Sequence, residues 1–90
     1  GVIRIREWAF AGCSGLTSVV IPNSVIEIGR SAFEGCSGLT TIIIPDILDA
    51  IGEWAFAGCS GLTNIVVPEG KTEYYKELLP VELHGKIKEF

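Results

Sequence analysis

The sequence has few of the side chains that most enzymes use for catalysis. It holds a single histidine, His84, which lies beside Gly85 near the C-terminus and far along the chain from the cysteines. A lone histidine in a tail is more often solvated than catalytic. Asp46 and Asp49 could flank a site, but a pair of surface acids is the expected background in an acidic chain. We therefore expect no catalytic residues and no enzyme activity.

The chain also lacks an excess of positive charge and any long apolar run. Seven Lys and Arg residues against eleven Asp and Glu residues give a net charge of −4 at pH 7. This balance argues against polyanionic partners, nucleic acid and anionic membrane among them. No apolar run approaches the roughly 18 residues of a membrane-spanning helix, and the first residues show no signal-peptide pattern. We expect one small domain of 90 residues with no membrane insertion.

The three cysteines are too far apart for a usual metal site. Cys13, Cys36 and Cys59 are spaced by 23 residues, whereas zinc ligands usually come in pairs two to four residues apart. Disulfides could join neighbours in a parallel stack, but three cysteines cannot all pair. A buried column of reduced thiols fits the spacing best, because cysteine packs like a small apolar group. The segment 12–15 (GCSG) lacks the lysine of a phosphate-binding loop, so we expect no cofactor and no metal.

What the sequence does contain is a repeat of 23 residues. The blocks AFAGCSGLTSVVIP, AFEGCSGLTTIIIP and AFAGCSGLTNIVVP align without a gap, and the segments 2–5, 25–28 and 48–51 match in the same register. A unit of this length cannot enclose a core alone, so copies must stack and share one. Val19 and Ile21 have strand spacing and Pro22 ends that strand. A second short strand follows over 25–28, with a turn at Gly29.

The segment after Gly29 is expected to form one helical turn. Ala32, Phe33 and Cys36 fall at positions i, i+1 and i+4, and Gly35 or Gly38 would close the turn. Each unit would then be strand, corner, strand and helical turn, with equivalent strands pairing in parallel. Phe33 should be among the most buried residues, in contact with Phe10 and Phe56.

The repeated pattern LTxVxIPxxVxxIGxxAFxGCxx resembles the BspA-like leucine-rich repeats of bacterial and protozoan surface proteins. The resemblance covers residues 1 to about 68 closely. It implies a right-handed leucine-rich-repeat β/α solenoid with short parallel strands, no catalysis, and a role in adhesion or protein binding on secreted or cell-surface proteins. Two departures, Ile47 and Asp49, make the corner at 46–50 less regular than its counterparts.

The repeats are expected to occupy residues 1–69 and a C-terminal cap residues 70–90. Thr72 can cap a helix over about 72–79, and Pro80 ends it. Residues 81–90 would form a short helix or an irregular tail. This capping helix would cover the apolar end of the last unit, as terminal repeats must. The front of the first unit has no such cover, so we expect a homodimer joined through the N-terminal coil or the sheet face. The alternative is a monomer whose first coil frays over residues 1–6.

Three apolar residues in a row on each main strand leave one of them facing outward. If Val19 and Ile21 point inward, two outward columns follow: Ser18, Thr41 and Asn64, and beside them Val20, Ile43 and Val66. In the resembling family the second column is commonly polar. Its apolar residues here could shield one another as branched side chains do in a sheet, or could form a stripe that binds a partner.

Trp8 and Trp54 share one slot of the repeat, with Ser31 between them. They could lie on the surface of their own unit, or anchor a partner, since tryptophan is favoured at interfaces. The sequence thus indicates a non-catalytic protein-binding or adhesion module. The alternative is a purely structural or self-assembling repeat segment, natural or engineered.

Overall fold

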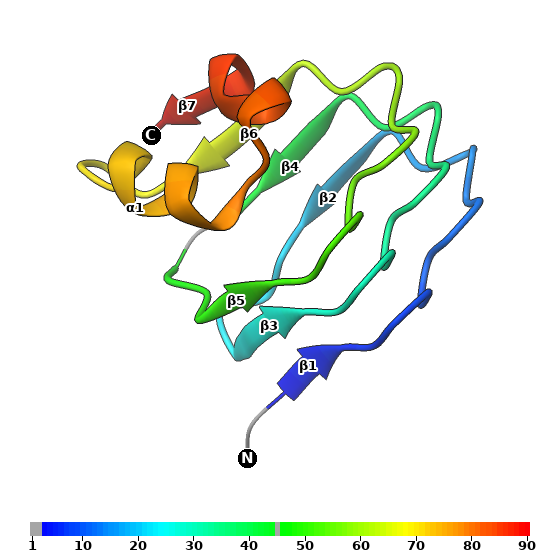
Figure 1. Cartoon of the computed structure of the whole chain (residues 1–90), viewed down its shortest axis with the longest axis horizontal. Helices are drawn as coiled ribbons and strands as arrows, with labels where there is room; N and C mark the ends of the chain where they lie inside the picture. The colour runs from blue at the N-terminus through cyan, green and yellow to red at the C-terminus, as the bar shows by residue number, and fades with distance from the viewer. Residues whose placement is uncertain (1–2, 45) are drawn as a thin grey trace.

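Two parallel sheets run along the molecule, and each repeat unit contributes one strand to each of them. The computed structural model describes residues 3–44 and 46–90, so the expectations for Val2 and Pro45 lie outside it. The first sheet has the order β1 (Ile3–Ile5), β3 (Val25–Ile28) and β5 (Ala50–Ile51). The second has the order β2 (Ser18–Val20), β4 (Thr41–Ile43), β6 (Asn64–Val67) and β7 (Ile87–Glu89) (Figure 1). We call residues 3–23 coil 1, residues 24–46 coil 2 and residues 47–69 coil 3.

The strands pair in the register of the repeat. Val19 lies opposite Ile42, and Ile42 lies opposite Ile65. This confirms the predicted parallel stacking. Irregularities occur in the first sheet, where the register shifts between Ile3 and Arg4 and where β5 has only two residues. The short β5 follows the corner that Ile47 and Asp49 alter.

The segment after each strand of the first sheet is not helical, which corrects the sequence prediction. We call the three equivalent stretches, 6–13, 29–36 and 52–59, the turn segments. In coil 2 the amides of Ala32, Glu34 and Cys36 donate to carbonyls three residues back. The amides between them, those of Ser31, Phe33 and Gly35, donate to coil 3 instead. This alternation prevents the i to i−4 bonding of an α-helix.

Positive φ angles make the alternation possible. Gly12, Gly35 and Gly58 have φ of 75°, 78° and 74°, and the repeat slot four residues earlier has φ of 62°, 55° and 59°. That earlier slot holds Trp8, Ser31 and Trp54, side chains that carry no sequence signal for this conformation.

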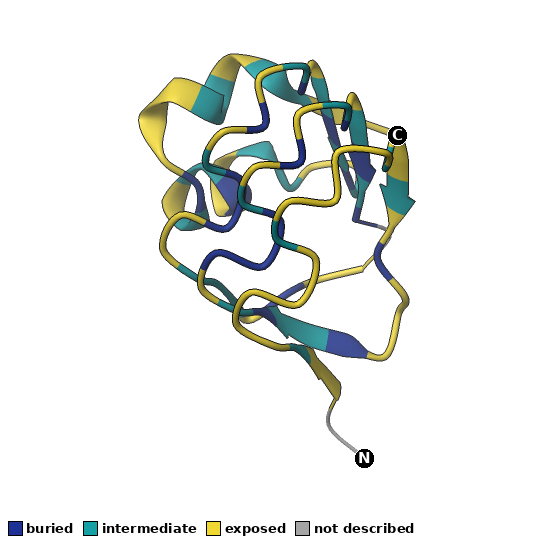
Figure 2. Cartoon of the chain, turned by 90° about the vertical axis from the view of Figure 1, so that its right-hand side faces the viewer, coloured by how far each residue is buried: buried dark blue, intermediate teal, exposed yellow. Residues whose placement is uncertain are grey.

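The core is centred on coils 2 and 3. Phe33 is fully buried, and its ring stacks between Phe10 and Phe56 with centroid separations of 5.3 and 5.6 Å. This confirms the predicted aromatic stack. Figure 2 shows that coil 1 is mostly exposed and that buried residues lie in the coils behind it.

The cysteine column is only partly buried. Cys36 and Cys59 are buried, and their thiols donate to the carbonyls of Phe10 and Phe33, each at 3.1 Å. Cys13 is exposed, contrary to the prediction. Each buried thiol is covered by the coil before it, and no coil lies before Cys13 in the part of the chain that the structure describes. All three thiols are free here, while their redox and metal state in solution stays a prediction.

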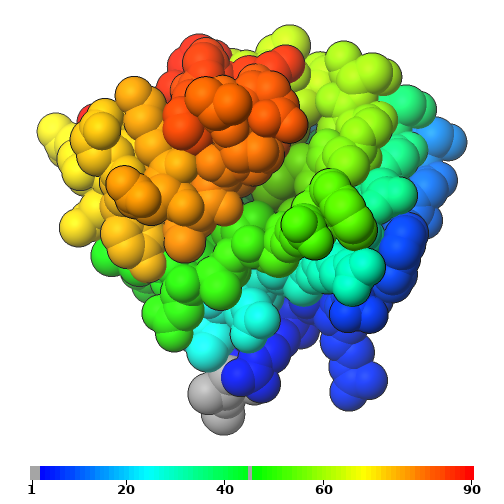
Figure 3. Space-filling model, in the orientation of Figure 1, coloured from blue at the N-terminus to red at the C-terminus, as the bar shows by residue number. Residues whose placement is uncertain are grey.

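The C-terminal segment contains α1 (Thr72–Leu78), the 3-10 helix η1 (Val81–Lys86) and β7. Figure 3 shows it, orange to red, lying against the green residues of coil 3. The expected side-chain cap is wrong: Thr72 is the first helical residue and its hydroxyl donates to Glu89 at 2.6 Å. That hydrogen bond lowers the pKa of Glu89. The strand β7 was not predicted, because its pairing with β6 is a long-range contact.

Candidate functional site

The outward face of the second sheet carries both predicted columns. Val20, Ile43 and Val66 are paired in register across β2, β4 and β6, and so are Ser18, Thr41 and Asn64. The side chains of Ile42 and Ile65 between them are fully buried, whereas Val20 is 60% exposed and Ile43 and Val66 are half-buried. The predicted inward and outward assignment is confirmed. The result is a short apolar stripe on an accessible sheet.

The stripe is bounded on one side and open on the other. β7 extends the sheet beyond β6 and places Lys88 next to Val66, so a charged residue follows the last apolar one. A lysine on an edge strand discourages further pairing. At the other edge, β2 presents Val20 with no neighbour among the described residues.

A row of threonines runs beside the two columns. The hydroxyl of Thr40 donates to the carbonyl of Thr17 at 3.0 Å, and Thr63 donates to Thr40 at 3.3 Å. Asn64 also donates to the hydroxyl of Thr41 at 3.4 Å. These bonds tie coil to coil at the start of each strand. The repeated LT in each sequence block was the signal for this row, and sequence reasoning did not use it.

Trp8 and Trp54 lie apart from the sheet columns, in the turn segments. They are 52% and 54% exposed. The guanidinium of Arg30 lies 5.2 Å from the ring centre of Trp54, a cation–π contact between neighbouring coils. Their equivalent, Ser31, is buried, and its hydroxyl has no partner among the described residues. The predicted binding residues therefore divide between two surfaces.

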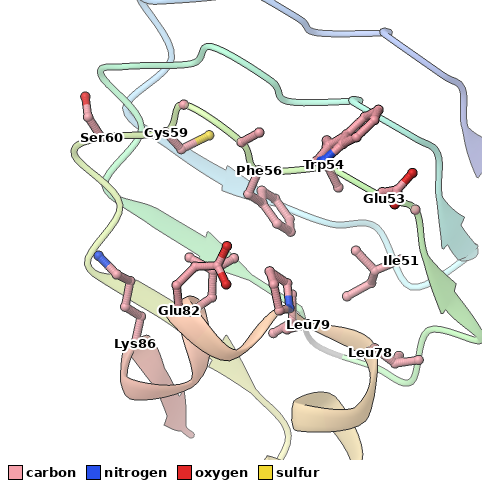
Figure 4. Close-up of a pocket in the computed structure, with 16 residues that line it drawn as sticks. Ile51, Glu53, Trp54, Phe56, Cys59, Ser60, Leu78, Leu79, Glu82 and Lys86 are labelled. Atoms are coloured by element: carbon pink, nitrogen blue, oxygen red, sulfur yellow. The ribbon is translucent and has the colours of Figure 1, made fainter.

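A cleft of about 710 Å³ separates the turn segment of coil 3 from the C-terminal segment. Figure 4 shows Trp54, Phe56 and Cys59 on one side of it and Leu79, Glu82 and Lys86 on the other. The side chain of Phe56 points into the space between, and Lys86 donates to the carbonyl of Leu62 at 2.7 Å. Nothing in the sequence pattern indicates this cleft, because it forms between segments distant along the chain.

Burial changes the acid–base behaviour of Cys59, which lines the cleft, and of Tyr75, which does not. Desolvation, with a smaller contribution from Cys36, raises the pKa of the Cys59 thiol to about 11. Desolvation also raises the pKa of Tyr75, whose hydroxyl donates to the carbonyl of Asp46 at 2.8 Å and accepts from the amide of Leu48 at 2.9 Å. A thiol with a raised pKa is a poor nucleophile at neutral pH.

The remaining candidate residues show no assembled site. His84 is half-buried rather than solvated, and its ring donates to the carbonyl of Leu79 at 2.9 Å. Asp46 and Asp49 are exposed, and Asp46 accepts from the amide of Ile47. Among residues 3–44 and 46–90, no group of His, Cys, Asp and Glu side chains could hold a metal ion. None of the helices described is long and apolar enough to cross a membrane.

A family model, that of the BspA type leucine rich repeat region, matches residues 1–79 in six copies. The chain belongs to the BspA-type leucine-rich repeat family. The comparisons found no match to it among curated proteins or among solved structures. The BspA-type assignment agrees with the parallel strands and the 23-residue register, and it extends beyond the predicted repeats into α1.

Proposed function

We propose that this BspA-type repeat segment is a non-catalytic protein-binding module, as in an adhesion protein of a bacterial surface or a secreted one. The observation that carries the proposal is the apolar column of Val20, Ile43 and Val66 on the accessible face of the second sheet. Polar residues are common there in the family. A partner with a matching apolar ridge would cover the stripe, and the Ser18, Thr41 and Asn64 column beside it supplies hydrogen-bonding groups.

The remaining architecture supports this role. We infer a right-handed solenoid whose repetition supplies area, with residues 70–90 acting as its cap. Three contacts favour a cap: β7 pairs with β6, Tyr75 bonds to the corner between coils 2 and 3, and Lys86 bonds to Leu62. A capped end leaves the outward sheet face accessible to a partner.

The test is capture by a panel of immobilised extracellular-matrix proteins. The triple variant Val20→Thr, Ile43→Thr and Val66→Thr keeps branched side chains in the strands but removes the apolar stripe. We expect it to fold and to lose capture. Val81→Thr is the matched control, because Val81 is an equally apolar residue, 77% exposed, away from the sheet face. Capture that survives the triple variant would contradict the proposal.

A second candidate function is self-assembly as a structural segment. It is favoured by the exposure of Ile3 and Phe10, which are 48% and 41% exposed on the outer side of coil 1. Covering those side chains with a second copy would remove apolar area from water. The oligomeric state of the chain tests this candidate, and the capture experiment tests the first.

A further inference from the structure

The three turn segments are joined by backbone hydrogen bonds that all point in one direction. In coil 1 the amides of Trp8, Phe10 and Gly12 donate to carbonyls of coil 2, at 3.1, 2.7 and 2.7 Å. In coil 2 the equivalent amides of Ser31, Phe33 and Gly35 donate to carbonyls of coil 3, at 3.0, 2.8 and 2.7 Å. The accepting carbonyls belong to every second residue: Arg30, Ala32 and Glu34, then Glu53, Ala55 and Ala57. Between turn segments, the donors therefore lie on one coil and the acceptors on the next, whereas beside them the amides of Gly29 and Gly52 donate back to Ile5 and Ile28.

Coil 3 has the equivalent backbone amides, but no following coil supplies carbonyls to accept their hydrogen bonds among the described residues. The amides of Trp54, Phe56 and Gly58 occupy the same slots, and they make no hydrogen bond with any residue that the structure describes. All three residues line the cleft. An occupant that supplies carbonyls would give these three amides hydrogen-bond partners and would exclude water from the apolar side chains of the cleft.

Other parts of coil 3 are already covered. β6 pairs with β7, the corner at Asp46 and Leu48 bonds to Tyr75, and the carbonyl of Leu62 bonds to Lys86. A whole coil of a second copy therefore cannot lie flat on this end. The open stretch is the turn segment together with β5, the edge strand of the first sheet.

We propose that this cleft binds a short peptide segment of a partner protein, which pairs with the amides of Trp54, Phe56 and Gly58 through the carbonyls of every second residue. The three amides donate to carbonyls of the occupant. At one end of the row lies Ile51, whose equivalents Ile5 and Ile28 accept from the amides of Gly29 and Gly52, so its carbonyl can accept one amide from the occupant. Both interfaces inside the chain show which side chain suits the middle carbonyl: it belongs to an alanine, Ala32 or Ala55. A small residue there would also fit beneath Leu79 and Leu83, which line the opposite wall. This cleft is separate from the outward sheet face. The peptide-binding proposal can therefore fail while the proposed function holds, and the reverse is also true.

The chain contains its own control for testing the free amides. Residues 7–17 and 53–63 both read EWAFAGCSGLT, so the intrinsic exchange rates of equivalent amides are alike. Hydrogen exchange of the full chain should show Trp54, Phe56 and Gly58 exchanging at least tenfold faster than Trp8, Phe10 and Gly12. The amides of Ser31, Phe33 and Gly35 provide a second bonded reference. Equal protection in coils 1 and 3 would overturn the proposal.

The binding itself is tested with a synthetic peptide of sequence 52–60, its cysteine replaced by serine. At ten times its dissociation constant, the peptide should slow exchange of Trp54, Phe56 and Gly58 by about elevenfold. Glu82→Trp adds bulk to a residue that lines the cleft and should abolish this protection. Val81→Trp changes the adjacent residue, which does not line the cleft, and should retain it.

Three results would overturn the proposal. The first is no change in exchange at the solubility limit of the peptide. The second is protection that Glu82→Trp leaves intact, which would place the peptide elsewhere. The third is protection that rises with chain concentration when no peptide is present, which would make a second copy the occupant.

Discussion

At the scale of the residue, Phe33 is the side chain whose removal should cost most. It is fully buried and stacks on Phe10 and Phe56. We expect Phe33→Ala to lower the free energy of unfolding by about 3–5 kcal/mol, because the ring leaves a cavity between two coils. Thermal unfolding followed by circular dichroism measures the loss. Phe10→Ala removes the same ring from a place that is 41% exposed and should cost only about 1–2 kcal/mol. Equal losses would show that the aromatic stack is not centred on coil 2.

The buried thiol of Cys59 makes stability depend on pH. Burial raises its pKa from 9.0 to about 11. The folded chain therefore keeps the proton at pH values where the unfolded chain has lost it. The contribution to the free energy of unfolding is complete below pH 9 and is lost as the pH rises toward about 11. Urea unfolding at several pH values between these limits should show stability falling.

Cys59→Ser isolates that contribution. A serine hydroxyl can still donate to the carbonyl of Phe33 but does not titrate in this range. The fall in stability should become shallower without vanishing, because the raised pKa of Tyr75 acts in the same direction. Cys13→Ser, at the exposed position, is the control and should leave the steeper fall in place. Identical slopes for the wild-type chain and Cys59→Ser would contradict this assignment.

At the scale of the element, α1 contacts the corner before β5 through two tyrosines, of which Tyr75 is buried and Tyr74 donates to the carbonyl of Leu48 at 2.6 Å. The hydroxyl of Tyr75 bonds both to the amide of Leu48 and to the carbonyl of Asp46. Tyr75→Phe would leave the buried amide without a partner, at a cost of about 1–3 kcal/mol. We expect a lower urea midpoint and faster hydrogen exchange at Leu48. Tyr74→Phe removes one hydroxyl bond at a more exposed ring, 38% exposed, and should cost less. An unchanged midpoint for Tyr75→Phe would show that α1 does not stabilise this corner.

The elements also show what the sequence could and could not predict. The strands and their register follow from a spacing of 23 residues, which is visible along the chain. The turn segments were mistaken for helix because the residues at Trp8, Ser31 and Trp54 give no sign of a positive φ. β7 was missed because Ile87 finds its partner at Ile65, far along the chain. The outward columns were predicted correctly because alternation along a strand is local, whereas the cleft depends on how the C-terminal segment folds back.

At the scale of the whole molecule, two exposed apolar surfaces predict that copies of the chain associate. The exposed Ile3 and Phe10 and the apolar stripe are two surfaces through which copies could join. We expect light scattering at micromolar concentration to give a mass above 9.7 kDa. The triple threonine variant of Val20, Ile43 and Val66 should restore the monomer if the stripe joins the copies. A monomer for the unaltered chain would contradict self-assembly.

The one-way hydrogen bonding of the turn segments also has an electrical consequence. The peptide groups between Glu7 and Trp8, Arg30 and Ser31, and Glu53 and Trp54 are joined end to end, and two further rows run parallel to this one. Each peptide carries a dipole of about 3.5 D, so aligned rows add as they do in an α-helix. The end at coil 1, where the carbonyls of Glu7, Ala9 and Ala11 face outward, is therefore the negative pole, and the cleft is the positive pole. Two copies that meet coil 1 to coil 1 bring two negative poles together, so the backbone dipoles disfavour that dimer. They do not disfavour a dimer that forms through the outward face of the second sheet.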